Sequence, residues 1–208
     1  MTNHKKQPIS RRSFIAMTGT GLAAAALYPK GSLFAKAVEA VPPAPGATSL
    51  AGNWRFALDR SNAGVDAGWF RKPLTADAHI SLPGILQTQG FGDEITAETK
   101  FIAALPRDMR WYLLPQYKQY TTPGKVLVPY LSQPVRHYLG VAWYQRDIDV
   151  PANWEGKRLD LFLERTRWQT DVYLDDKMIG TNRSLVAPHE FDLGILKPGK
   201  HRLTIRID

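Results

Sequence analysis

The feature that most constrains the fold is a strict alternation of apolar and polar side chains in several short segments. The clearest examples cover residues 141–150, 158–163, 170–175 and 201–207. A period of two is the spacing of a β-strand that turns one face to a core and the other to water. Pro, Gly, Asn or Asp lie in or near the breaks, and no comparable stretch has helical spacing. The pattern predicts an all-β protein, an antiparallel β-sandwich.

The first half of the chain has two further strand-like segments and then loses its regularity. Residues 50–58 alternate, and residues 79–82 form a second predicted strand that Pro83-Gly84 ends. From about residue 85 to 134 the pattern weakens, although 111–114 and 125–128 are candidates for short strands. An insertion of this length in a compact domain usually carries function or packs over one edge.

The N-terminus has the layout of an export signal. Two lysines and the pair Arg11-Arg12 precede an apolar stretch, 15–27, that is too short to cross about 30 Å of hydrocarbon as a helix. We therefore predict a twin-arginine signal peptide over residues 1–40, cleaved after Ala37 or Ala40, rather than an amphipathic helix or a basic tail. A Pro-rich linker follows at 41–48, and the sandwich occupies 49–208. The mature protein is expected in the periplasm or outside the cell, without membrane contact.

The formal net charge of +8 does not indicate a nucleic-acid partner. Residues 1–40 hold six of the 27 basic side chains and one of the 19 acidic ones, so most of the excess belongs to the predicted signal. The remaining basic residues are scattered among acids and form no stripe that could follow phosphates. Cysteine is absent, which excludes disulfides, thiol catalysis and cysteine-ligated metals.

One stretch carries a family resemblance. Tyr138 to Pro151 contains a Gly, then Trp143-Tyr144, a basic residue and a strand that ends in Pro. Other marks follow the same order along the chain: Leu50-x-Gly52-x-Trp54-x-Phe56, Leu82-Pro83-Gly84, Val172-Tyr173-Leu174-Asp175, Ile179-Gly180, Glu190-Phe191-Asp192-Leu193 and Leu196-Lys197-Pro198-Gly199. Together they resemble the N-terminal sugar-binding domain of family 2 glycoside hydrolases, from about Leu50 to the last residue. The resemblance implies a galactose-binding-like jelly roll.

Two departures from the family limit what the resemblance implies. Asp175-Asp176-Lys177-Met178 stands where the family usually has an Asn-Gly hairpin turn. The insertion at 85–134 is longer than in well-known β-galactosidases of the family, so galactosides, mannosides and glucuronides all stay open as substrates. The family loop that reaches the active site corresponds to about 90–100, but its asparagine is not matched, and no substrate-binding residue is named.

The resemblance also implies that the catalytic residues lie elsewhere. Retaining glycosidases need two carboxyl groups about 5 Å apart. In the family both are glutamates on a downstream (β/α)8 barrel of about 250 residues, which this chain does not contain. The chain's own acids are predicted on solvated strand faces and in turns: Glu164, Asp171, Asp175, Asp176, Glu190 and Asp192. His137 and His189 are read as hydrogen-bonded loop residues rather than a metal pair. No catalytic, cofactor or metal residue is predicted.

Aromatic side chains are the remaining candidates for sugar contact, because flat rings stack on pyranose faces. Trp54, Phe56, Trp143, Tyr144 and Phe162 lie in predicted strands and are mostly assigned to the core. Trp143 and Tyr144 are consecutive, so only one is expected inside the sandwich, and the other is a candidate for contact with a neighbouring domain. Four rings in the insertion are freer to face a ligand or the absent barrel: Trp111, Tyr112, Tyr117 and Tyr120.

These observations give three hypotheses about function. The first is a sugar-binding domain of a family 2 glycoside hydrolase, a fragment that takes part in hydrolysis of β-linked glycosides only with the catalytic barrel. The second is a stand-alone exported carbohydrate-binding module without enzyme activity. The third is a sandwich that binds a protein partner and no sugar.

Overall fold

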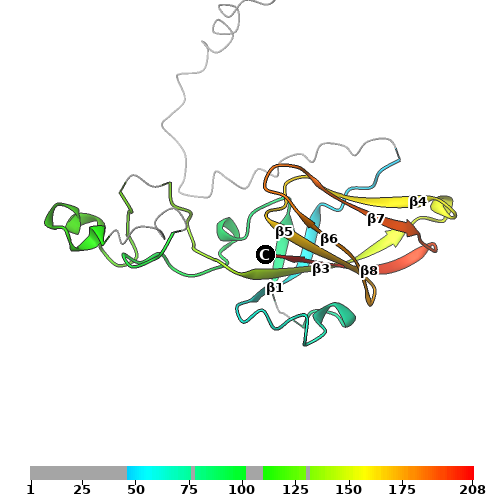
Figure 1. The fold of residues 1–208 in the computed structure, drawn as a ribbon, viewed down its shortest axis with the longest axis horizontal. Coiled ribbons are helices and arrows are strands. Elements are labelled where there is room, and N and C mark those ends of the chain that lie inside the picture. Colours follow the sequence, from blue (N-terminus) through cyan, green and yellow to red (C-terminus); the bar gives the residue numbers. More distant parts are fainter. Residues whose placement is uncertain (1–45, 76–77, 102–109, 130–131) are drawn as a thin grey trace, which may run out of the picture. The chain divides into compact units, whose positions relative to one another are not determined.

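The computed structural model describes residues 46–75, 78–101, 110–129 and 132–208 (Figure 1). The chain divides into two compact units, 1–42 and 43–208, and the second is described below. The predicted signal peptide at 1–40 and most of the predicted linker lie outside the described residues. Within the described ranges, no helix is long and apolar enough to span a membrane.

The second unit is built from two antiparallel sheets, as the alternating pattern predicts. The larger sheet has the strand order β2-β1-β3-β8-β5-β6, and the smaller one pairs β4 with β7 (Figure 1). The strands are β1 (Gly52–Asp59), β2 (His79–Leu82), β3 (Val141–Val150), β4 (Arg158–Leu163), β5 (Gln169–Leu174), β6 (Lys177–Arg183), β7 (His189–Ile195) and β8 (Gly199–Ile207). The described helices are short 3-10 turns: η1 (Trp69–Arg71), η2 (Gln87–Gln89), η4 (Trp111–Leu113), η5 (Pro115–Tyr120) and η6 (Ala152–Trp154).

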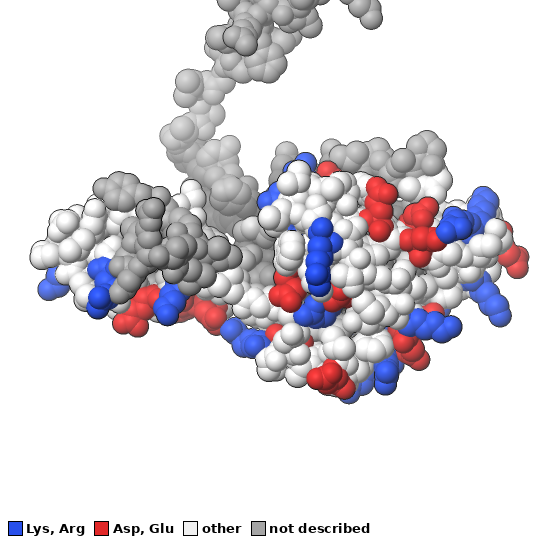
Figure 2. Space-filling model, in the orientation of Figure 1, with Lys and Arg blue, Asp and Glu red and all other residues white. Residues whose placement is uncertain are grey.

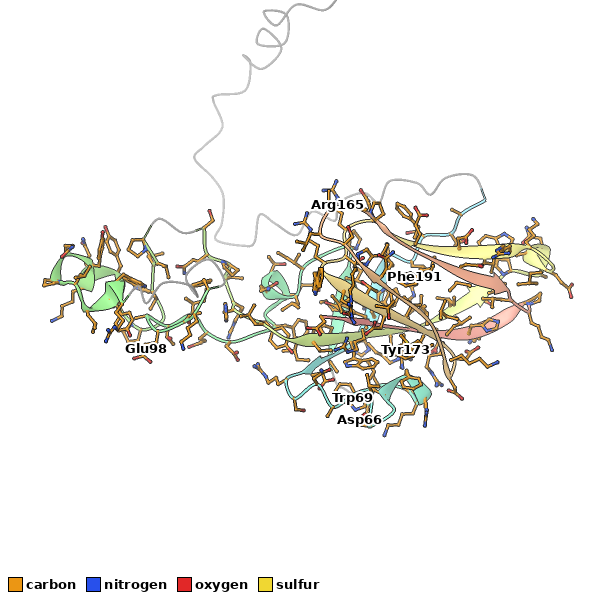
Figure 3. All side chains as sticks on the ribbon, in the orientation of Figure 1. Asp66, Trp69, Glu98, Arg165, Tyr173 and Phe191 are labelled. Atoms are coloured by element: carbon orange, nitrogen blue, oxygen red, sulfur yellow. The ribbon has the colours of Figure 1, made fainter. Side chains whose placement is uncertain are left out.

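The main core lies between the two sheets. Phe56 and Tyr144 of the large sheet meet with ring centroids 5.1 Å apart, and Leu161 and Phe191 from the small sheet belong to the same buried cluster. Figure 3 shows Phe191 on β7, on the side of the large sheet opposite to Trp69. Full burial of a large apolar side chain stabilises a fold by about 1.5–3 kcal/mol, so this cluster is the principal source of stability.

The opposite face of the large sheet is also buried, by residues 60–75, which we call the cover segment. Phe70 of the cover segment stacks on Tyr173 at 4.4 Å between centroids, and Trp69 lies 5.8 Å from Trp143. Figure 3 shows Trp69 and Tyr173 on this side of the sheet. Trp143 and Tyr144 are therefore both buried, 0% and 8% exposed. They lie on opposite faces of β3, as predicted, and only Tyr144 belongs to the core between the sheets. The suggestion that the outward ring contacts a neighbouring domain was wrong for Trp143, because the cover segment buries it.

Two polar side chains fasten the cover segment to the sheet. The Asp59 carboxylate accepts hydrogen bonds from Ala63 N at 2.9 Å, Gly64 N at 2.8 Å and Trp143 Nε1 at 3.0 Å. Gln145, fully buried, accepts a bond from Leu74 N at 2.9 Å on Oε1 and donates one from Nε2 to the carbonyl of Lys72 at 3.0 Å. These bonds satisfy buried backbone groups of a segment that has no sheet partners of its own.

The structure corrects the two strands suggested in the insertion. Residues 111–113 form the 3-10 helix η4, and residues 125–128 belong to no strand.

A tight turn at Asp175-Asp176 joins β5 to β6, although the Asn-Gly pair that is usual in the family is absent. Leu174 pairs with Lys177 across the turn, and Asp175 has a left-handed φ of 53°. Aspartate tolerates that conformation better than most residues with a Cβ atom.

Candidate functional site

One of the six candidate acids lies in the interior. Asp171 is 6% exposed, and its Oδ2 lies 2.7 Å from Arg206 Nη1 while Thr181 Oγ1 donates to its Oδ1 at 2.7 Å. The prediction that Asp171 faces solvent was wrong, because β5 is buried on both faces. A buried carboxylate must be paired, and Arg206 supplies the partner.

Three of the exposed acids, Glu164, Asp175 and Asp192, pair with cations in the described structure. Asp175 and Asp192 are about half exposed, as predicted, and they pair with His201 Nδ1 at 3.0 Å and with Arg158. The Arg158 hydrogen bond lowers the pKa of the Asp192 carboxyl. At Asp175, partial burial raises the pKa of the carboxyl group. Hydrogen bonds from His201 and from the Arg202 amide outweigh this effect, so the pKa of Asp175 is lowered as well.

These pKa shifts run opposite to those of a glycosidase acid. A catalytic general acid needs a carboxyl group whose pKa is raised by an apolar setting or a second carboxylate. Four described carboxyl groups have a clearly shifted pKa, and all four are lowered: Asp93, Asp147, Asp175 and Asp192. Each of these four carboxylates has a neighbouring cation in the described structure.

The two histidines serve structure as well. His189 begins β7 and is fully buried, with Nδ1 2.8 Å from Thr170 Oγ1 and Nε2 3.2 Å from the carbonyl of Ser184. The prediction of a hydrogen-bonded histidine is confirmed, although its residue lies on a strand. His137 pairs its backbone with Asp93. Among the residues that the structure describes, no group of three or more potential ligands could hold a metal ion.

The basic residue of the family-like stretch has a structural role. Arg146 Nη1 donates to the carbonyls of Leu50 and Ala51, both at 2.8 Å, and its guanidinium lies over Trp54. Arg146 thus holds the two residues that precede β1 against β3. This pairing explains why a basic residue follows the aromatic pair on β3.

The loop at 90–100 begins at a closed neck. Asp93 and His137 exchange backbone hydrogen bonds of 2.7 and 3.0 Å, which brings together the two ends of residues 94–136, called the excursion below. Arg60 clamps the neck, with Nη2 and Nη1 2.8 and 3.0 Å from the Asp93 carboxylate oxygens. Gly92, with a φ of 104°, fits here because a Cβ would lie 2.8 Å from the His137 carbonyl oxygen.

The four candidate rings of the insertion come together within the excursion. Trp111 contacts Tyr112 and Tyr117 at 6.1 and 6.4 Å between centroids, and Tyr117 contacts Tyr120 at 6.4 Å. All four are partly exposed, and Leu113 beside them is 63% exposed. This aromatic cluster has the chemistry for stacking on a sugar ring, as do the exposed rings of Phe162 and Trp168 outside it. The sequence indicated its members, but it gave no signal that they contact each other.

Comparison with known proteins gives the family context. Residues 47–112 match the family model described as glycosyl hydrolases family 2, sugar binding domain. The match contains β1, β2 and the first half of the excursion, and it ends before β3.

Solved structures share the fold. A β-glucuronidase from Ruminococcus gnavus in complex with C6-substituted uronic isofagomine has a TM-score of 0.51 at 20% identity, over 77% of this chain and 21% of that chain. The same enzyme with uronic deoxynojirimycin gives 0.50 at 19% identity over the same shares. A β-glucuronidase from an uncultured Clostridium sp. gives 0.49 at 22% identity, again over 77% and 21%. This chain spans about one fifth of the length of those enzymes. In its matched segment and in its fold, the β-sandwich is similar to the sugar-binding domain of glycosyl hydrolases of family 2.

Proposed function

We propose that the chain is the sugar-binding part of an exported β-glycosidase whose catalytic carboxylates lie in a separate barrel domain. The observation that carries the proposal is the family 2 match within a sandwich that has the fold found in β-glucuronidases. The cation-paired carboxylates of the sandwich agree with catalysis elsewhere.

Two elements are proposed to reach the sugar. The loop at 90–100 leaves the sandwich at the Asp93–His137 neck, and the aromatic cluster around Trp111 provides ring faces. A β-glucuronide is the first substrate to test, because the similar solved structures are β-glucuronidases.

The test compares the purified 208-residue chain with a polypeptide that also carries the barrel, using nitrophenyl β-glucuronide, β-galactoside and β-mannoside. We expect hydrolysis only with the barrel. In that longer protein, Trp111→Ala should raise KM about tenfold with little change in kcat, since a lost stacking contact weakens binding. Leu127→Ala, at another exposed position of the excursion, is the matched control. Hydrolysis by the 208-residue chain would overturn the proposal.

If the chain is instead a stand-alone carbohydrate-binding module, a different result is expected. A complete sugar site would bind an oligosaccharide without the barrel, whereas the proposed domain binds its substrate only with it. Isothermal titration of the chain with oligosaccharides therefore separates the two functions.

We also propose export through the twin-arginine route, supported by the Arg11-Arg12 pair and the weakly apolar stretch after it. Replacing both arginines by lysine should leave the protein in the cytoplasm, as measured by cell fractionation. Unchanged export of that variant would refute this route.

A further inference from the structure

Two loops at one end of the sandwich carry exposed apolar side chains that the proposed function does not use. They are residues 164–168 between β4 and β5 and residues 184–188 between β6 and β7, and we call them the end loops. Trp168, Leu185 and Val186 are 48%, 58% and 92% exposed. Single exposed apolar residues are normal on a protein surface, whereas a group of them on adjoining loops indicates an interaction surface.

The end loops adjoin each other and are held in place by hydrogen bonds. Ser184 N donates to the carbonyl of Trp168 at 3.1 Å, and a hollow lies between the loops, lined by residues of both. Ser184 Oγ accepts bonds from Val186 N at 3.1 Å and from Ala187 N at 2.8 Å. The backbone that presents the apolar side chains is therefore ordered, which lowers the entropic cost of association.

The end of β8 lies directly beside the end loops. Asp208 O accepts hydrogen bonds from Trp168 N at 3.0 Å and from Gln169 N at 3.2 Å, and Asp208 N donates to the carbonyl of Gln169 at 3.0 Å. In a longer polypeptide, the segment after Asp208 would therefore start next to the exposed indole. A short covalent connection gives the following domain an effective concentration on the order of millimolar, so a modest patch is enough to hold it.

The excursion leaves the sandwich at the same end. Ala142 near the start of β3 and Thr170 near the start of β5 both pair with Ile207 at the end of β8. His137 of the neck lies just before β3 in the chain. The end loops, the end of β8 and the neck of the excursion therefore share one end of the sandwich.

We propose that the end loops are the surface on which the domain after Asp208 packs in the complete glycosidase, through an apolar contact with Trp168, Leu185 and Val186. The inference rests on the proposed function, because it needs a polypeptide longer than 208 residues. Docking here places the next domain at the end from which the excursion leaves, so that the excursion lies beside a catalytic site outside the sandwich.

A second copy of this chain is the alternative occupant, and it is disfavoured by size. Stable complexes between separate proteins usually bury about 800 Å² on each partner, and three exposed side chains are a small surface beside that. Figure 2 shows acidic and basic side chains interspersed on the visible face of the described residues, without a large area of one sign that would attract a separate partner. A covalently connected domain needs neither a large area nor a steering charge.

The test measures amide hydrogen exchange in the 208-residue chain and in the longer polypeptide that also carries the barrel. We expect exchange in residues 164–168 and 184–188 to be at least tenfold slower in the longer protein. Residues 175–178, at the opposite end of β5 and β6, should exchange alike in both. Equal exchange of the end loops in the two proteins would overturn the proposal.

Variants of exposed residues show whether the apolar contact is the cause. In the longer protein, Leu185→Asp with Val186→Asp should return the exchange of residues 164–168 to the rate in the 208-residue chain. Met178→Asp, at a 54% exposed position at the opposite end of β6, is the matched control and should leave the slow exchange unchanged. Slow exchange that persists in the double variant would contradict the proposal, as would protection of the 208-residue chain that increases with its concentration, which would indicate a second copy.

Hydrolysis of the nitrophenyl glycosides by the same preparations tests the proposed function separately. An active longer protein whose end loops exchange as fast as in the 208-residue chain would refute only the docking surface. An inactive longer protein with protected end loops would refute the glycosidase and support the docking surface.

Discussion

Arg206 and Asp171 form an ion pair of 2.7 Å between side chains that are only 7% and 8% exposed, on the sheet face that the cover segment buries. Arg206 Nη2 also donates to Asn62 Oδ1 at 2.9 Å, so the pair links β5, β8 and the cover segment. The ion pair thus connects the sheet to the layer that the alternating pattern did not reveal.

Asp171→Ala should destabilise the sandwich by about 3 kcal/mol, because it leaves the buried Arg206 guanidinium with only the half-exposed Asp208 carboxylate, 3.2 Å from Nη2, as its counter-charge. Arg158→Gln, which breaks the exposed pair with Asp192, should cost far less, because water screens that pair. Urea unfolding followed by circular dichroism measures both. Equal losses in the two variants would contradict the buried character of the Asp171 pair.

Gly64→Ala should destabilise the protein by about 1–3 kcal/mol. A Cβ at this position would lie 2.6 Å from Trp143 Nε1 and 2.8 Å from Asp59 Oδ2, within the hydrogen bonds that fasten the cover segment. Gly180→Ala is the control, since its Cβ would meet only Phe191 at an ordinary 3.6 Å. Thermal unfolding of the two variants tests the difference, and a stable Gly64→Ala would mean that the cover segment packs loosely.

Stability should fall as the pH rises above 10, with Tyr144 as a main cause. Burial raises the pKa of Tyr144 to about 12. Below pH 10 its hydroxyl is protonated in both the folded and the unfolded chain. Between pH 10 and 12 only the unfolded chain ionises, so up to about 2–3 kcal/mol is lost as the pH passes through the folded pKa.

The measurement for Tyr144 is the free energy of unfolding at pH 8 to 11.5 for the parent and Tyr144→Phe. The phenylalanine variant should lose stability less steeply. Burial also raises the pKa of Tyr138 and Tyr173, so part of the slope should persist. Identical slopes in the two proteins would rule out a buried Tyr144 hydroxyl.

The excursion should be removable. Asp93 and His137 already pair as neighbours in an antiparallel bridge, so Asn-Gly in place of residues 94–136 would close a two-residue hairpin between them. The shortened chain should keep cooperative unfolding and the amide spectrum of the sandwich. Loss of cooperative folding would show that the excursion is part of the core.

The sequence predicted most of the large sheet because apolar and polar side chains alternate along β1, β3 and β8, although residues 141–145 and 203–206 are buried on both faces of the sheet. Strands β6 and β7 were not predicted from alternation, since Gly180 and Gly194 interrupt them and few of their side chains are large and apolar. Their residues entered only through the family resemblance. The period of two identifies the two faces of a strand, but it does not show what packs against each face. For this reason the sequence did not predict that the cover segment buries Trp143, or that Asp171 is buried.

The candidate site was predictable only in part. The aromatic residues around Trp111 stood out by type, while their mutual contacts depend on 3-10 turns that leave no periodic signal. The hollow lined by residues 164–167 and 185–188 could not be predicted from the sequence, because its walls come from two loops, β4–β5 and β6–β7, that are far apart along the chain.

The central claim is that this sandwich serves a glycosidase whose catalytic carboxylates lie outside it. The most direct measurement is the nucleotide sequence after the codon for Asp208. The account predicts an open frame that encodes a barrel with two glutamates on its strand ends. A stop codon, with no barrel encoded nearby, would contradict it.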